Sequence, residues 1–135
     1  MKSFLKLDKY KFNKIIVNQE VIETICEIAQ QTYPKEFIAF LEGKNKNNIL
    51  RIEGLAYQEY IAGYTSTVFK DYLPLTSNVV GTVHSHPGPH NKPSNADLRV
   101  FSKKGVVHMI IKKPYHSEDI QAYDLHGRKI EFGIR

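Results

Sequence analysis

The stretches Gly81-Thr-Val-His-Ser-His-Pro87 and Pro93-Ser-Asn-Ala-Asp97 organise the expected fold of this chain. The first follows residues that favour β-strands, and side chains alternate between the two faces of an extended chain. His84 and His86 should therefore point to the same side, with Ser85 on the other. Two imidazoles at one edge of a strand can share a metal ion, so this stretch predicts part of a metal site.

The second stretch supplies a third ligand. A loop of Gly, Pro, Asn and Lys leads to Ser94, a typical helix-capping residue, which places Asp97 in the first turn of a helix. The carboxylate there can turn back toward the histidines. Two imidazoles, one carboxylate and an open fourth position for water are typical of a catalytic zinc site. A closed structural site usually needs several cysteines, and the sequence contains only Cys26.

Both stretches also have a purely structural interpretation. Ser-x-x-Asp before an apolar run is a common helix capping box, and a His-x-His pair on a strand is as often a surface or hydrogen-bonded pair. Glu36, at the start of another predicted strand, would by itself be taken for an exposed or ion-paired carboxylate. The conjunction of all three features favours a metal centre.

Together these residues predict a metal-activated hydrolase. Zinc lowers the pKa of bound water and can polarise the carbonyl under attack. Glu36, which is not expected to be a ligand, would be the general base that passes the proton of the water to the leaving amine. Ser94 would donate a hydrogen bond to the tetrahedral oxyanion while it still caps its helix. The expected catalytic residues are therefore Glu36 and Ser94.

Composition narrows the class of protein. The 135 residues, 41% hydrophobic and 11% aromatic, suit one globular domain that spans residues 1–135. No apolar run reaches the roughly 20 residues that span a bilayer, and charges interrupt the N-terminus, so neither a membrane anchor nor a signal peptide is expected. With a single cysteine, a cytoplasmic location follows. The net charge of +5 is spread along the chain, which favours a solvated basic face over a nucleic-acid site, with an acidic protein partner as the alternative.

Hydrophobic periodicity and helix-breaking residues predict an α/β fold. The expected strands and helices are strands at 14–17, 35–41, 49–55, 79–86 and 106–111, helices at 19–32 and 94–104, a turn at 43–48, and a closing hairpin of 119–124 with 129–134. His108 lies in one of these strands without a partner at ligand spacing, and we expect it to be a core histidine.

The segment 57–72 is rich in aromatic residues and has two interpretations. It can be a second hairpin whose rings pack on the core. Alternatively, it is an aromatic wall that receives an extended peptide by backbone pairing at a strand edge. On the second interpretation the substrate-binding residues are Tyr57, Tyr60, Tyr64 and Phe69.

These residues carry a family resemblance. Glu36, His84-Ser-His-Pro87 and Ser94-Asn-Ala-Asp97 closely resemble the JAMM motif of the MPN (JAB/Mov34) metalloproteases, in which seven residues separate the last two blocks, as residues 87–93 do here. The lead-ins at 33–37 and 80–84 are similar to those of compact archaeal and bacterial members. The order of the expected elements matches the family over nearly the whole chain.

The resemblance implies a cytidine-deaminase-like sandwich, in which helices flank a mixed central sheet with small hairpins, and a zinc ion on His84, His86 and Asp97. It also implies cleavage after the C-terminal glycines of ubiquitin-like modifiers or β-grasp sulfur carriers, with a homodimer or an accessory protein left open. The chain lacks the long insertions with which eukaryotic relatives grip ubiquitin. A metal-free MPN scaffold module is the main alternative. A zinc nucleoside deaminase would need a Pro-Cys-x-x-Cys pair that this sequence lacks.

Overall fold

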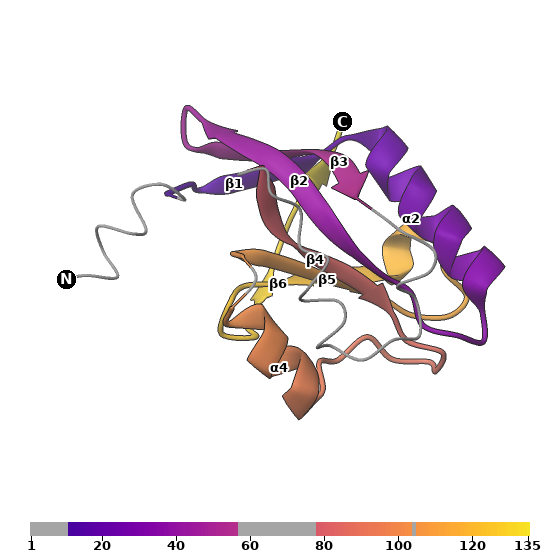
Figure 1. Ribbon diagram of the computed structural model, residues 1–135. Helices are drawn as coiled ribbons and strands as arrows, with labels where there is room; N and C mark the ends of the chain where they lie inside the picture. Colours follow the sequence, from indigo (N-terminus) through magenta and orange to yellow (C-terminus); the bar gives the residue numbers. More distant parts are fainter. Residues whose placement is uncertain (1–10, 57–77, 104) are drawn as a thin grey trace.

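A computed structural model describes residues 11–56, 78–103 and 105–135, which form one mixed sheet with helices on both sides (Figure 1). The strands, in chain order, are β1 (Lys14–Val17), β2 (Ile38–Lys46), β3 (Ile49–Ala56), β4 (Val79–Ser85), β5 (Val107–Ile111), β6 (Ile120–Tyr123), β7 (Lys129–Ile130) and β8 (Gly133–Ile134). The helices are α2 (Gln19–Thr32), α4 (Asn95–Phe101) and the 3₁₀ turn η2 (Ser117–Asp119). The predicted α/β class is confirmed. Within the described ranges, no helix is long and apolar enough to cross a membrane.

The sheet is strongly curled. Its strand order is β7-β6-β5-β4-β2-β3-β1-β8, so β7 and β8 lie at opposite ends. Only two residues separate them, and an extended chain covers at most about 3.6 Å per residue, so Ile130 and Gly133 lie within about 11 Å of each other. The predicted closing hairpin is therefore wrong in its second half. Lys129–Ile130 pairs with β6, whereas Gly133–Ile134 pairs in parallel with β1, because the curl brings the free edge of β1 close to the end of β7.

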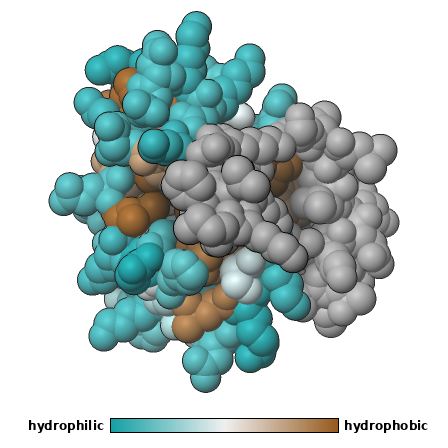
Figure 2. All heavy atoms as spheres, turned by 90° about the vertical axis from the view of Figure 1, so that its left-hand side faces the viewer, coloured by the Kyte–Doolittle hydropathy of each residue, from teal (hydrophilic) through white to brown (hydrophobic). Residues whose placement is uncertain are grey.

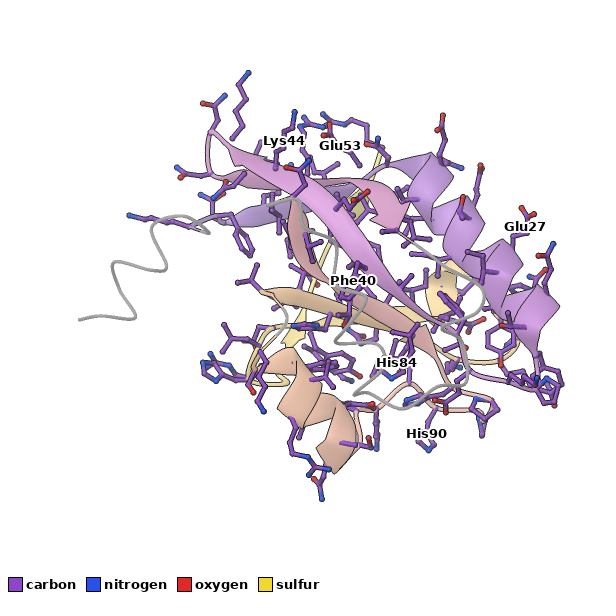
Figure 3. The ribbon with its side chains drawn as sticks, viewed as in Figure 1. Glu27, Phe40, Lys44, Glu53, His84 and His90 are labelled. Atoms are coloured by element: carbon purple, nitrogen blue, oxygen red, sulfur yellow. The ribbon has the colours of Figure 1, made fainter. Side chains whose placement is uncertain are left out.

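Helix α2 has the predicted bounds and covers one face of the sheet. Its apolar stripe is buried against the main core, and Glu27 points away from the sheet (Figure 3). Asn18 precedes the first turn, and the helix ends before Pro34, which cannot continue it. Helix α4 lies on the opposite face, where Phe101 joins a second cluster with Ile110 and Tyr123. The sheet is thus covered on both sides.

The hairpin of β2 and β3 is longer than predicted. Instead of a turn over 43–48, strand β2 continues through a bulge after Glu42 as far as Lys46. Only Asn47 and Asn48 form the turn, with φ of 55° and 64°. Asparagine tolerates the left-handed region, and two such residues make the tight turn that matches the twist of a hairpin.

Other boundaries also differ from the predictions, and three of them lie near the residues of the predicted metal site. Strand β2 begins at Ile38, because Lys35 is still in a turn and donates its N–H to the Thr32 carbonyl at 2.8 Å. Strand β4 ends at Ser85, one residue short of His86. Helix α4 ends at Phe101 and not in the lysine pair that follows.

The surface is consistent with this core. Where described residues face the viewer in Figure 2, hydrophilic side chains dominate and hydrophobic atoms show only in small patches. Apolar side chains are concentrated in the two faces of the sheet, as the burial of all five residues of β5 illustrates.

Candidate metal centre

The two histidines stand at the end of a central strand. Strand β4 pairs with β2 on one side and β5 on the other, with His84 opposite Ile38 and Ile110. The His86 N–H still donates to the Ile111 carbonyl at 2.9 Å. Both imidazoles lie on the same side, with ring centroids 4.9 Å apart and Nε2 atoms 3.1 Å apart. Neighbouring strands therefore fix the backbone of both residues.

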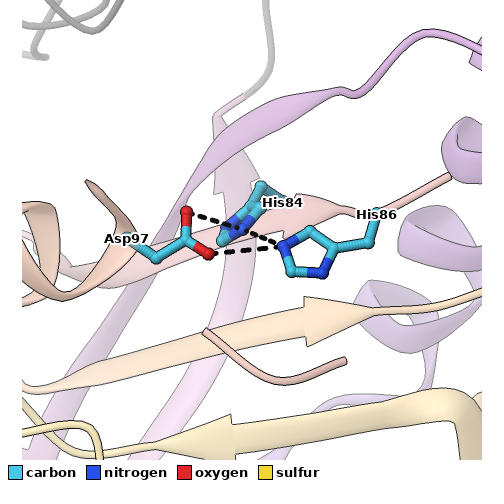
Figure 4. A group of neighbouring side chains, drawn as sticks. All are labelled: His84, His86 and Asp97. Atoms are coloured by element: carbon cyan, nitrogen blue, oxygen red, sulfur yellow. Dashed lines mark hydrogen bonds and ion pairs between the residues drawn. The ribbon is translucent and has the colours of Figure 1, made fainter. Parts of the chain in front are cut away.

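Helix α4 brings the carboxylate. Ser94 caps the helix: its Oγ accepts the Asp97 N–H at 3.1 Å, and Asp97 Oδ2 accepts the Ser94 N–H at 2.8 Å. The same carboxylate reaches the histidines, with Oδ1 3.2 Å from His84 Nε2 and Oδ2 3.3 Å from His86 Nε2 (Figure 4). The capping box and the metal-facing carboxylate are thus one feature. We call His84, His86 and Asp97 the candidate metal centre.

The spacing of these atoms fits a zinc ion. A tetrahedral ion with bonds of about 2.0–2.1 Å holds its ligand atoms about 3.3–3.4 Å apart. Here the two Nε2 atoms are 3.1 Å apart, and each faces a different oxygen of Asp97, His84 at 3.2 Å and His86 at 3.3 Å. In addition, His86 Nδ1 lies 3.3 Å from the His90 carbonyl oxygen, which favours a proton on Nδ1 and leaves the Nε2 lone pair for a metal. Figure 3 labels His84, on β4, and His90, in the loop that follows this strand.

The electrostatics keep the carboxylate ionised. Burial opposes ionisation of Asp97, but hydrogen bonds from His84 and His86, and from the Ser94 N–H, hold its pKa well below the usual range. Conversely, the hydrogen bond to Asp97 raises the pKa of His86 against the effect of burial. The site therefore offers an anionic oxygen beside two imidazole nitrogens.

Glu36 lies close to this group without belonging to it. It is exposed, precedes β2 by two residues, and is not among the three residues that could hold one ion. Its negative charge nevertheless contributes to the raised pKa of His86. The pKa of Tyr115 is raised mainly by burial, and the charge of Glu36 adds to this shift. A carboxylate whose charge acts on a possible ligand, and which is not itself one of the donors, is a candidate for the general base.

The structure adds a residue that the sequence did not suggest. The Tyr115 hydroxyl donates to the His86 carbonyl at 3.0 Å, and its side chain is buried. Its φ of 71° lies in the left-handed region, which is unusual for a residue other than glycine. No motif marks this position, because the contact joins residues 29 apart in sequence.

Other predicted residues lie elsewhere. His108 is fully buried, its Nδ1 lies 2.8 Å from Thr82 Oγ1, and burial lowers its pKa to about 4, which confirms a core histidine. The expected substrate-binding residues lie outside the described residues: Tyr57, Tyr60, Tyr64 and Phe69.

Known proteins resemble this chain in sequence and fold. Residues 18–126, which include the candidate metal centre, Glu36 and Ser94, match the family described as prokaryotic homologues of the JAB domain. A probable metalloprotease from Haloferax volcanii is 30% identical over 120 residues, which cover 80% of this chain and 71% of that protein.

Two solved structures have a similar fold. A JAB1/MPN domain protein from Archaeoglobus fulgidus is 28% identical, with a TM-score of 0.69 over 91% of this chain and 98% of its own. A JAMM protein, described as a metalloprotease-like zinc site in the proteasome and signalosome, is 29% identical, with a TM-score of 0.69 over 91% of this chain and 99% of its own.

Proposed function

This chain belongs to the prokaryotic homologues of the JAB domain, a metalloprotease-like family, and on that premise we propose that it is a zinc-dependent peptidase of the JAMM type. One observation carries the proposal. The Nε2 atoms of His84 and His86 lie 3.1 Å apart, and each lies 3.2 or 3.3 Å from an Asp97 oxygen, which is close to the spacing of zinc ligands. The charge of Glu36, which is not among these donors, contributes to the raised pKa of His86. A zinc ion there would supply a water of lowered pKa and polarise the carbonyl of the substrate.

The protein residues have separate roles in the proposed reaction. Glu36 takes the proton of the attacking water and delivers it to the leaving amine, so it needs to be ionised at the start of the cycle. Ser94 donates its hydroxyl hydrogen to the oxyanion of the tetrahedral intermediate. This donation is compatible with capping, because the cap uses Ser94 Oγ only as an acceptor. Asp97, His84 and His86 hold the ion.

The proposed substrate is the peptide or isopeptide bond after the C-terminal glycines of a ubiquitin-like, β-grasp protein. Family membership supports this choice, and the exposed position of Glu36 beside the candidate metal centre gives an extended, small-residue tail access to the general base. The competing proposal is a scaffold module without protease activity. The complete set of donor atoms disfavours it, since a scaffold has no need of them.

The test is turnover of Gly-Gly-linked ubiquitin-like conjugates by zinc-loaded protein. We expect cleavage after the second glycine, its loss on addition of a chelator, and its loss in Glu36→Gln with the zinc retained. A protein that holds no stoichiometric zinc, or whose Glu36→Gln variant matches the wild type, would favour the scaffold.

A further inference from the structure

Glu36 is held in place through its backbone. Its side chain is exposed, and among the described residues its carboxylate has no hydrogen-bond or ion-pair partner. The residue lies between the end of α2 and the start of β2, in a short connection outside both elements. The position of its carboxylate relative to the candidate metal centre must therefore come from the residues beside it, and the next residue, Phe37, is fully buried.

The backbone of Phe37 forms two hydrogen bonds with Ser85 of β4, one through its carbonyl and one through its N–H. The Ser85 N–H donates to the Phe37 carbonyl at 3.1 Å, and the Phe37 N–H donates to Ser85 Oγ at 2.9 Å. In a regular antiparallel pair the second bond would go to the carbonyl of the opposite residue. Here the Ser85 hydroxyl oxygen accepts that bond instead. Phe37 lies just before the first residue of β2, outside the regular pairing.

Ser85 stands between the two histidines of the candidate metal centre. It is 1% exposed and points away from the side on which the imidazoles lie. Ser85 thus lies between two proposed metal ligands in sequence. It also hydrogen-bonds Phe37, the residue next to the proposed general base. Its two hydrogen bonds therefore connect the strand end that carries the proposed ligands His84 and His86 to the segment that carries the proposed general base, Glu36.

We propose that Ser85 is a positioning residue that sets the register of Glu36 against the candidate metal centre through the Phe37 backbone. The inference rests on the proposed function of Glu36 as general base. Loss of the hydroxyl removes the acceptor to which the Phe37 N–H donates, so the segment at Phe37 should shift or loosen. A displacement of about 1 Å in a reacting group can cost ~10²-fold in rate, whereas the ligands themselves remain.

The test compares Ser85→Ala with Ser85→Thr, which keeps the hydroxyl, and with Thr82→Val. Thr82 is the matched control, because it is also a buried hydroxyl on β4 but hydrogen-bonds His108 and lies opposite Phe40, not Phe37. Hydrogen exchange of the Phe37 amide, followed by NMR in metal-free protein, reports the bond directly. We expect exchange at least tenfold faster in Ser85→Ala and close to the wild-type rate in Ser85→Thr and Thr82→Val.

Kinetics and zinc affinity complete the test. Ser85→Ala should lower kcat by ~10- to 10²-fold with little change in KM or zinc affinity, and Ser85→Thr should restore it. If Ser85→Ala does not fold, Ser85→Cys, with its weaker acceptor, should show an intermediate exchange rate and kcat. Wild-type exchange at Phe37, or loss of zinc in proportion to kcat, would overturn the inference.

The two proposals fail in distinguishable ways. If Glu36→Gln retains full activity, the proposed function fails, and the Phe37 exchange rates still report whether Ser85 holds this segment. If Glu36→Gln is inactive but Ser85→Ala has the wild-type kcat, only the role of Ser85 is overturned.

Discussion

The candidate metal centre can be compared with a second group of potential ligands in the described part of the chain. His116, Glu118 and Asp119 also bring three donor atoms within 4.8 Å of one another. However, all three come from one short segment around η2, and the side chains of His116 and Glu118 are 60% and 76% exposed. The candidate metal centre joins a strand to a helix, and its side chains are 10% to 18% exposed.

The carboxylates of the two groups also differ in their existing partners. Asp119 caps η2 by accepting the His116 N–H at 2.9 Å, and its other oxygen lies 3.5 Å from Lys112 Nζ. That ammonium would compete with any cation. Asp97 caps a helix as well, but each of its oxygens also faces an imidazole nitrogen. Suitable donor types alone therefore do not distinguish the two groups; the candidate metal centre differs in that its donors are partly buried, come from separate elements and, among the described residues, have no ammonium beside them.

Removal of one ligand from each group should separate them most clearly. Asp97→Ala should lose its zinc and its peptidase activity to background, since two imidazoles alone bind zinc weakly, whereas Glu118→Ala should keep both. Metal content after dialysis, measured by mass spectrometry, and turnover of a Gly-Gly conjugate check this. Loss of zinc from Glu118→Ala with retention in Asp97→Ala would reverse the assignment.

Glu36→Gln should sharpen the distinction between ligand and base. The variant keeps its zinc, because Glu36 is not one of the three donors, but kcat should fall by ~10²- to 10⁴-fold without a proton acceptor. Steady-state kinetics on protein of known zinc content make the measurement. A lower zinc content in step with kcat would instead make Glu36 a ligand.

Ser94 tests whether the cap has a second role that the Asp119 cap lacks. Ser94→Ala and Ser94→Gly should both lower kcat by ~10²- to 10³-fold through loss of the oxyanion donor. Only Ser94→Ala should lose about 1 kcal/mol of unfolding free energy, because glycine caps nearly as well as serine. Kinetics and urea denaturation of both variants separate the roles. If kcat follows stability, the hydroxyl has only a structural role.

Tyr115→Phe should remove a hydrogen bond that positions one proposed ligand, His86. Without the hydrogen bond to the His86 carbonyl, zinc affinity should fall about tenfold, as is common when a group that orients a ligand is removed. Tyr123→Phe is the matched control, since its hydroxyl donates to the carbonyl of Asn91, which is not a ligand. Competition with a chromophoric chelator measures both affinities. Equal losses would point to the loop as a whole and not to His86.

His108 is a core histidine outside the candidate metal centre. Its replacement should change the free energy of unfolding and leave zinc binding unchanged. Its folded pKa of about 4 lies below the ordinary 6.5, so the unfolded state binds more protons between these values. The contribution of neutral His108 to the free energy of unfolding is therefore fully present above pH 6.5. The free energy of unfolding falls by about 3 kcal/mol as the pH approaches 4. Urea denaturation across this range should show a shallower fall in His108→Gln. Parallel curves for the two proteins would contradict it.

Local signals made much of this architecture predictable. Helix α2 was bounded correctly because its apolar spacing ends at Pro34, and the candidate metal centre could be assembled from strand alternation and one N-cap. The core position of His108 followed from the absence of a partner at ligand spacing. These features depend on residues close in sequence, where steric and hydrogen-bonding rules act strongly.

Features that depend on the curl of the sheet could not be predicted. The pairing of β8 with β1, the contact of Tyr115 with His86 and the bonds of Ser85 to Phe37 join segments that no local pattern relates. The sequence alone does not predict the extension of β2 to Lys46, because Gly, Lys and Asn have low strand propensity, and only pairing with β3 compensates for it. The role of the aromatic segment at 57–72 stays a prediction.

The most direct measurement is the anomalous diffraction of crystals grown with zinc, recorded on both sides of the zinc absorption edge. We expect one strong peak per chain, within bonding distance of His84 Nε2, His86 Nε2 and an Asp97 carboxylate oxygen, with no peak at His116, Glu118 and Asp119. A peak at the second group alone, or none between the two imidazoles, would contradict it.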